Sequence, residues 1–180
     1  IYDMYKIKSE VIYLGANKIF FKNNLTSKSN AILCLGDIKA RHALFLIETA
    51  YRLSKKRNDF EIWIAGDKDA HGKELKELAR KLGISKIIKF YGKVSDEKLA
   101  SLYSSALVFT HLVKDAPFGM QVTEAMASGT PVISWKPGGP EESITHNETG
   151  FLISQFNHDE LIKHIESFLD DPKLSLEMGK

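Results

Sequence analysis

Short apolar runs and longer amphipathic stretches alternate along most of this chain. From Ala31 onward, continuous apolar runs bounded by turn residues predict buried strands. The expected strands cover residues 31–36, 60–66, 86–92, 107–112, 131–135 and 150–153. Between them, apolar residues recur at helical spacing, as at Leu44, Ile47 and Tyr51. The expected helices cover residues 42–56, 72–83, 95–106, 119–128 and 158–171.

The alternation of strands and helices predicts an α/β fold. Parallel strands joined by helices need right-handed crossovers, which place helices on both faces of a mostly parallel sheet. Near-continuous apolar strands are typical of a sheet covered in this way. We therefore expect a Rossmann-like domain over residues 31–180. Residues 1–30 are polar and irregular apart from a short strand expected at 11–14, and they are expected to form a lead-in or interdomain linker.

Composition and charge limit the classes of function. The 180 residues are enough for one domain with a sizeable core, and 43% of them are hydrophobic, as in ordinary globular domains. The net charge of +2 is too small to indicate nucleic-acid binding. The one cysteine, Cys34, lies in an apolar run and predicts a core thiol, and the six histidines show no metal-ligand spacing with it. No apolar run is as long as a membrane span, and we expect a cytoplasmic protein.

Three loops are predicted to meet at one edge of the sheet. In open sheets of this kind, ligands bind beyond the carboxyl ends of the strands. That rule selects residues 36–42, 113–119 and 136–142, each of which follows an expected strand. A G-x-G-x-x-G fingerprint is absent, and residues 66–74 lack the spacing of a phosphate-binding P-loop.

The second of these loops leads directly into a helix. Gly119 at the junction lets backbone approach a ligand, and the free N–H groups of a first helical turn favour phosphate. The alternative is that Gly119 only caps the helix. Gln121, Glu124 and Ser128 follow i, i+3, i+7 spacing and are expected to form one polar stripe. The stripe is either simply solvated or placed so that Glu124 accepts hydrogen bonds from vicinal hydroxyls such as those of a ribose.

The first and third loops offer positive charge and tight turns. Lys39 and Arg41 precede a helix and are suited to balance a diphosphate, with Arg41 offering a bidentate fork. Gly138 and Gly139 allow a tight turn near a ligand, where one of the two following glutamates would hold a hydroxyl. The alternatives are a solvated loop in the first case, and a turn with a helix start in the second.

Several blocks of the chain together resemble one known family. In their order and spacing, PFGMQVTEAMASGTPVI, GGPEE and TGFLI resemble the donor-binding half of glycosyltransferase family 4. The members are retaining enzymes with the GT-B fold that use nucleotide sugars. AILCLGDIKARHALFLIETA, FEIWIAG and FYGKVSDEKLASLYSSA are similar to preceding parts of that domain, and VIYLGANKIFFK is similar to the hinge that leads into it. The resemblance covers nearly the whole chain.

The resemblance implies a nucleotide-sugar site that needs no metal or other cofactor. The donor would be a nucleotide hexose such as UDP- or GDP-hexose, and its diphosphate would lie at the start of the helix. The residues expected to line this donor site are Gly36, Phe118, Gly119, Met120, Gln121, Gly138 and Gly139.

The resemblance also implies roles for four charged residues and one apolar residue. Lys39 and Arg41 would stabilise the leaving phosphate, and charge stabilisation of this kind is usually a large catalytic contribution. Glu124 matches the second glutamate of the family's E-x7-E motif, which holds the ribose hydroxyls. The backbone around Lys93 and Val94 matches the segment that meets the base.

A larger parent protein is a further implication of the resemblance. The family has an N-terminal Rossmann-like domain that binds the acceptor, and these residues contain no such domain. The parent is expected to transfer a hexosyl group to a saccharide or a lipid-linked acceptor, as in polysaccharide biosynthesis. A lipid-linked acceptor would bring the parent to the inner face of the membrane. The domain alone is expected to bind donor weakly and to catalyse nothing efficiently.

Two positions depart from the family pattern. The first glutamate of E-x7-E falls on Ala116, and the arginine that follows the first-loop glycine falls on Asp37. An aspartate repels a diphosphate. These departures leave two alternatives open: a degenerate, non-catalytic nucleotide-sugar-binding module, and a sugar-nucleotide epimerase of the same overall fold. An epimerase acts on a nucleotide sugar alone, whereas a transferase needs an acceptor.

Overall fold

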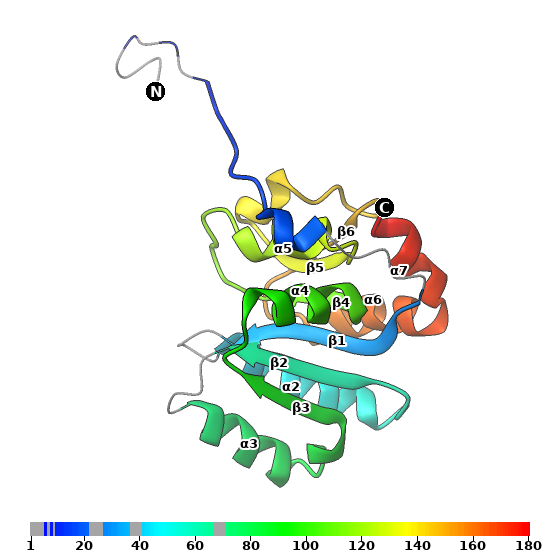
Figure 1. Ribbon diagram of the computed structural model, residues 1–180. Helices are drawn as coiled ribbons and strands as arrows, with labels where there is room; N and C mark the ends of the chain where they lie inside the picture. The colour runs from blue at the N-terminus through cyan, green and yellow to red at the C-terminus, as the bar shows by residue number, and fades with distance from the viewer. Residues whose placement is uncertain (1–5, 7, 9, 22–26, 37–40, 67–70) are drawn as a thin grey trace.

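A six-stranded sheet forms the centre of the computed structural model, which describes residues 6, 8, 10–21, 27–36, 41–66 and 71–180. The strands follow the order β3-β2-β1-β4-β5-β6 (Figure 1). Every pairing between neighbouring strands is parallel, which confirms the predicted α/β fold. The bounds are Ser29–Gly36 for β1, Glu61–Gly66 for β2, Ile88–Gly92 for β3, Ala106–His111 for β4, Val132–Lys136 for β5 and Gly150–Ser154 for β6.

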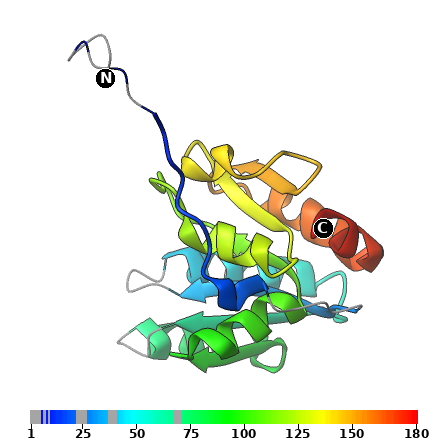
Figure 2. The ribbon, with the colours of Figure 1, turned by 45° about the horizontal axis from the view of Figure 1, so that its top comes forward.

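Helices cover both faces of this sheet (Figures 1 and 2). One face is covered by α2 (Arg41–Ser54), α3 (His71–Lys81), α6 (His158–Asp170) and α7 (Pro172–Met178). The other face is covered by α4 (Asp96–Ser105), α5 (Met120–Ala127) and a short 3-10 helix, η1 (Lys18–Phe21). Two more 3-10 turns, η2 (Ser85–Ile87) and η3 (Gly139–Glu142), precede β3 and follow β5.

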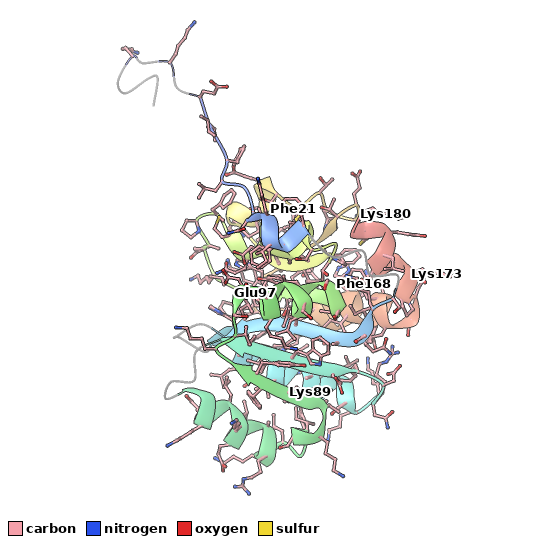
Figure 3. All side chains as sticks on the ribbon, in the orientation of Figure 1. Phe21, Lys89, Glu97, Phe168, Lys173 and Lys180 are labelled. Atoms are coloured by element: carbon pink, nitrogen blue, oxygen red, sulfur yellow. The ribbon has the colours of Figure 1, made fainter. Side chains whose placement is uncertain are left out.

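Each face of the sheet has its own apolar core. Successive side chains of a strand point to opposite faces, so β1 sends Cys34 to one core and Leu33 to the other. The expected core thiol is confirmed, because Cys34 is only 1% exposed. Phe168 of α6 is fully buried, whereas Phe21 of η1 projects at the surface (Figure 3). Within the described ranges, no helix has the length and apolar character needed to cross a bilayer.

Residues that favour helix ends flank α3, α4 and α5. The Ser95 side chain accepts a hydrogen bond from the N–H of Lys98 at 3.4 Å, which satisfies one free donor at the start of α4. Gly83 and Gly129 follow α3 and α5 with φ of +73° and +71°, the left-handed conformation that ends many helices.

Two parts of the fold differ from the sequence-based expectation. The strand predicted at residues 11–14 is wrong, because this segment pairs with no strand among the described residues and its side chains are 58% to 87% exposed. Further along the lead-in, Phe20 is 3% exposed and packs edge-on against Tyr103 at 5.9 Å, so η1 belongs to the packed body. Helix α7 was not expected, and it begins where Asp171 accepts a hydrogen bond from the N–H of Lys173 at 3.1 Å.

A half-buried lysine, Lys28, connects strand starts at the amino edge of the sheet. The Nζ atom of Lys28 donates to the carbonyl oxygens of Ser104 and Gly129 and to the Oγ1 atom of Thr130, each at 2.8 Å. These acceptors precede β4 and β5, so one side chain connects the starts of three central strands. Burial lowers the pKa of Lys28 to about 8, and among the described residues the ammonium has three neutral acceptors and no carboxylate to oppose this shift.

Candidate functional site

The strand order creates a switch point between β1 and β4. The chain builds β2 and β3 on one side of β1, then returns to place β4, β5 and β6 on the other side. Connections at the carboxyl ends of β1 and β4 therefore leave in opposite directions, and they leave a crevice between them. The first two predicted loops follow these two strands.

A cavity of about 170 Å³ occupies this crevice. Its walls come from the ends of β1 and β4, the start of α2, the loop after β4 and the start of α5. They include Leu35, His42, Thr110, His111, Ala116, Gly119 and Gln121. Two wider and shallower hollows lie at the amino side of the sheet, around Asn30 with Lys86 and around Arg57 with Asp170. We place the candidate site at the switch point, because ligands of open α/β sheets bind at the carboxyl edge.

The start of α5 presents free backbone donors beside the cavity. Gly119 precedes the helix with φ of +86°, and a Cβ atom there would lie 3.3 Å from the His111 ring, Pro140 and Val122. Among the described residues, no atom accepts a hydrogen bond from the N–H groups of Met120 or Gln121. These donors carry the positive end of the helix dipole, so the junction is suited to an anion such as phosphate.

The third loop is locked to the second. The N–H of Gly139 donates to the carbonyl oxygen of Ala116 at 2.7 Å, and the N–H of Gly138 donates to the Oε2 atom of Glu141 at 2.9 Å. A Cβ atom on Gly139 would lie 2.5 Å from the Cα atom of Phe118. Both glycine N–H groups therefore have acceptors within the protein. The absence of side chains here lets η3 press against the loop that opens α5.

Glu124 lies on α5 at the boundary between solvent and the protein interior. Its side chain is half-buried, and its Oε2 atom accepts a hydrogen bond from the hydroxyl of Tyr103 at 3.3 Å. Burial raises the pKa of Glu124; the Tyr103 hydroxyl opposes that shift and the charge of Asp96 adds to it. No described residue donates to Oε1, so this oxygen can accept a hydrogen bond from a ligand.

The polar stripe predicted on α5 is not continuous. Gln121 is exposed and Glu124 is half-buried, but Ser128 is only 2% exposed. Its hydroxyl has no hydrogen-bond partner among the described residues. The expectation for Ser128 was wrong because the helix ends at this turn and its last residue packs against the body of the protein.

Lys93 and Val94 form the turn between β3 and α4. Lys93 is exposed, and Val94 is partly buried in the core on the α4 and α5 side. Asp96, in the first turn of α4, is near enough to act on the pKa of Glu124. The turn and the carboxylate of Glu124 therefore lie on the same side of the carboxyl edge.

Only the two ends of the first loop lie within the described residues. Gly36 is the last residue of β1 and is half-buried beside β2. Lys39 and Asp37 lie outside the described residues. Arg41 is the first residue of α2, which begins at the same edge as the cavity.

The sequence reading missed three side chains near this site. His111 is 4% exposed, lines the cavity, and places its Nδ1 atom 3.3 Å from the Oγ atom of Ser134. Tyr103, the partner of Glu124, is fully buried. Tyr13 of the lead-in stacks on Phe118 with ring centroids 6.2 Å apart. For His111 a signal existed: it is an ionisable residue at the carboxyl end of a strand whose first four residues are apolar.

Comparison with known proteins identifies relatives along nearly the whole chain. A model of the family described as glycosyl transferases group 1 matches residues 15–180. A D-inositol 3-phosphate glycosyltransferase of Streptomyces avermitilis is 34% identical over 106 residues, which cover 59% of this chain and 23% of the relative. The chain spans between 23% and 50% of the length of the first three curated relatives.

Solved structures share the fold. Sucrose-phosphate synthase from Thermosynechococcus elongatus superposes with a TM-score of 0.75 at 28% identity, over 87% of this chain and 40% of that one. The HepE protein of Anabaena, in complex with UDP and glucose, superposes with a TM-score of 0.81 at 22% identity, over 94% of this chain and 50% of that one. The parallel sheet with helices on both faces is thus the arrangement found in GT-B glycosyltransferases.

Proposed function

This chain belongs to the group 1 glycosyltransferases, and we propose that it is the nucleotide-sugar-binding domain of a retaining family 4 enzyme. The parent transfers a hexosyl group from a UDP- or GDP-hexose to a saccharide or lipid-linked acceptor. The predicted donor domain of residues 31–180 also includes η1 and the first residues of β1, and the segment before η1 leads into it from an acceptor-binding domain of the parent.

One observation carries the proposal: the cavity at the switch point is bounded by the start of α5, where the N–H groups of Met120 and Gln121 have no acceptor among the described residues. An anionic group that reaches the cavity meets these donors and the helix dipole together. The HepE structure is a complex with UDP and glucose, which supports a nucleotide sugar as the ligand of this domain too.

Each part of the donor then has a partner. The diphosphate lies at residues 118–121, Glu124 accepts hydrogen bonds from the ribose hydroxyls through Oε1, and the turn of Lys93 and Val94 meets the base. Gly36 allows close approach at the end of β1. Gly138 and Gly139 contribute indirectly, because their contacts hold the loop of residues 115–119 in place.

The chemical step breaks the bond between the anomeric carbon of the sugar and the β-phosphate oxygen. A bond from that carbon to the acceptor oxygen forms on the same face, and the hydroxyl proton passes to the departing β-phosphate oxygen, which releases it to solvent. The nucleoside diphosphate departs with added negative charge. The cations of Lys39 and Arg41, together with the N–H groups at α5, stabilise that charge most strongly in the transition state.

A thermal-shift screen of UDP-, GDP- and ADP-hexoses tests this proposal. A ligand that binds only the native state raises the unfolding temperature. We expect one nucleotide class to stabilise the chain, and the free nucleoside diphosphate of that class to stabilise it as well. The absence of any shift at millimolar ligand would contradict the proposal.

A second candidate, a degenerate binding module, is favoured by Ala116. This residue lines the cavity with a methyl group where the family has an acid. Activity of the full-length parent separates the two candidates. Transfer by the wild-type parent, with no gain in the Ala116→Glu variant, supports the enzyme; transfer that appears only in the variant supports the module.

A further inference from the structure

His111 is a buried ionisable residue to which the donor-binding scheme gives no role. It ends β4 on the face that α4 and α5 cover, and it is 4% exposed. A Cβ atom on Gly119 would lie 3.3 Å from the Cε1 atom of the ring. The imidazole therefore lies directly beneath the residue that opens α5.

The hydrogen bonds around Ser134 assign the position of the ring proton. The Ser134 hydroxyl donates to the carbonyl oxygen of His111 at 3.0 Å, and the carbonyl oxygen of Trp135 lies at 3.3 Å. Because a hydroxyl has one proton, the Oγ atom of Ser134 is left to accept from the ring. Nδ1, at 3.3 Å, is thus the protonated nitrogen, and Nε2 has a free lone pair.

This free lone pair opens to the cavity. Within the described part of the chain, no atom forms a hydrogen bond with Nε2 of His111. The fully buried polar atoms without a partner are Ser128 Oγ and Trp135 Nε1, and Nε2 is not among them. Since His111 lines the cavity, a ligand there can reach Nε2. Burial, with a smaller contribution from the nearby His42, lowers the pKa of His111 to about 4, so the ring is neutral at pH 7.

Ala116 lines the same cavity and is 5% exposed. Its methyl group supplies no hydrogen-bond acceptor, although the family pattern places a carboxylate here, close to the donor sugar. The hydroxyls of a bound sugar need acceptors, because a buried hydroxyl without one is costly. A neutral imidazole nitrogen can meet that need without adding negative charge beside the diphosphate.

We propose that His111 takes the place of the missing acid at position 116: its Nε2 atom accepts a hydrogen bond from a hydroxyl of the transferred sugar. This inference rests on the proposed function and makes His111 a specificity-determining residue of the donor site. The sugar selected is one that directs a hydroxyl toward the end of β4. A sugar with hydrogen or fluorine at that position leaves the imidazole unpaired and binds less tightly.

Two substitutions of His111 distinguish the contribution of Nδ1 from that of Nε2. His111→Asn retains a polar group near Nδ1, next to Ser134, and removes the acceptor on the cavity side. His111→Gln carries its amide one bond farther and restores an acceptor near Nε2. The probes for calorimetry are UDP with UDP-glucose and GDP with GDP-mannose, measured on the wild-type chain and on both variants. Thermal unfolding reports whether each variant is folded.

We expect His111→Asn to weaken nucleotide-sugar binding about five- to tenfold, as loss of one hydrogen bond does. Binding of the corresponding nucleoside diphosphate should not change, and His111→Gln should retain most of the sugar-dependent affinity. In the wild-type chain, nitrogen NMR offers a measurement that needs no variant. The Nε2 resonance of His111 should shift when the nucleotide sugar is added and stay in place when the nucleoside diphosphate is added.

Three outcomes of these experiments would contradict the inference. Equal loss of sugar and diphosphate binding in His111→Asn would mean that His111 only supports the loop. An unchanged affinity ratio, or an Nε2 resonance that does not respond to the sugar, would overturn the inference while the proposed function stands. Failure of the wild-type chain to bind either probe pair would overturn the proposed function and this inference with it.

Discussion

Glu124 shows how one side chain can be fixed by the fold and still serve a ligand. The buried Tyr103 hydroxyl donates a hydrogen bond to Oε2 of Glu124 at 3.3 Å, while Oε1 accepts from no described residue. The tyrosine sets the rotamer of the carboxylate and leaves one acceptor oriented outward. A residue held in this way loses little freedom when it binds, which favours its use as a ribose ligand.

Replacement of Glu124 by Gln should therefore weaken nucleotide binding. Gln keeps the shape, but it loses the charge and turns one acceptor into a donor. We expect the dissociation constant for the free nucleoside diphosphate to rise about tenfold or more, because a hydrogen bond to a charged group is worth about 1.5–3 kcal/mol. Isothermal calorimetry measures this change. Glu177→Gln on the exposed side of α7 is the matched control, and an equal effect in both variants would contradict the assigned role.

His111 makes a prediction about acid stability. Its pKa in the folded state is about 4, below the value of 6.5 for a free histidine. Between these values the unfolded chain binds more protons, so stability falls as the pH drops from 6.5 toward 4. This site accounts for a loss of about 3 kcal/mol in the free energy of unfolding. Urea unfolding of His111→Asn across this range should show a shallower decline than the wild-type chain. Parallel curves would contradict the prediction.

A second prediction about stability concerns Lys28, at the amino edge of the sheet. Its ammonium satisfies two carbonyl oxygens and one hydroxyl. Lys28→Met leaves these acceptors buried without a donor, and we expect the free energy of unfolding to fall by about 2 kcal/mol. Lys173→Met, at the exposed start of α7 (Figure 3), should change it by less than about 0.5 kcal/mol. If chemical denaturation gave the same loss in the free energy of unfolding for both variants, the three hydrogen bonds of Lys28 would contribute nothing to stability.

At the scale of elements, the sequence predicted what local pattern determines. The six strands and five of the helices follow from apolar runs and helical periodicity. Residues 11–14 show where local pattern is not enough to predict a strand. Their apolar run resembles a strand, but a strand exists only when a neighbouring strand pairs with its backbone, and none of the described strands does so. Helix α7 was missed because Pro172, at its first position, resembles a helix end as much as a helix start.

The candidate site was predictable only as a set of loops. Strand order decides which loops meet, and the parallel pattern restricts that order enough to place the loops at one edge. The roles of Gly138 and Gly139 were not predictable. Their N–H groups bond within the protein, a fact that depends on how closely η3 approaches Phe118.

That close approach makes Gly139 a test of the coupling between the loops. In Gly139→Ala the new methyl group would collide with the backbone of Phe118, so η3 and the second loop must separate. We expect a loss of about 1–3 kcal/mol in the free energy of unfolding, as in other overpacked sites, together with weaker nucleotide binding. Gly72→Ala in α3 is the matched control, because outside its own helical turn no atom of the described residues lies within 4 Å of the added methyl group. Normal nucleotide binding by a folded Gly139→Ala variant would show that the two loops act separately.

At the scale of the whole molecule, one edge of the sheet carries all the proposed chemistry. The switch-point cavity and the starts of α2 and α5 lie there, and the lead-in reaches it through the stack of Tyr13 on Phe118. Val11, Ile12 and Leu14 beside Tyr13 are largely exposed. In our account the acceptor-binding domain of the parent covers this segment and closes the cleft, so the chain alone binds donor but transfers no sugar efficiently.

The central claim is that a nucleoside diphosphate binds at the start of α5. An amide NMR titration of this chain, with the nucleotide sugar that gives the largest thermal shift, tests it most directly. The account predicts that the N–H resonances of Met120 and Gln121 move most, with smaller changes at Glu124 and around Lys93. It would be contradicted if those resonances stayed in place while others moved, for example those around Asn30 and Lys86 at the amino edge of the sheet.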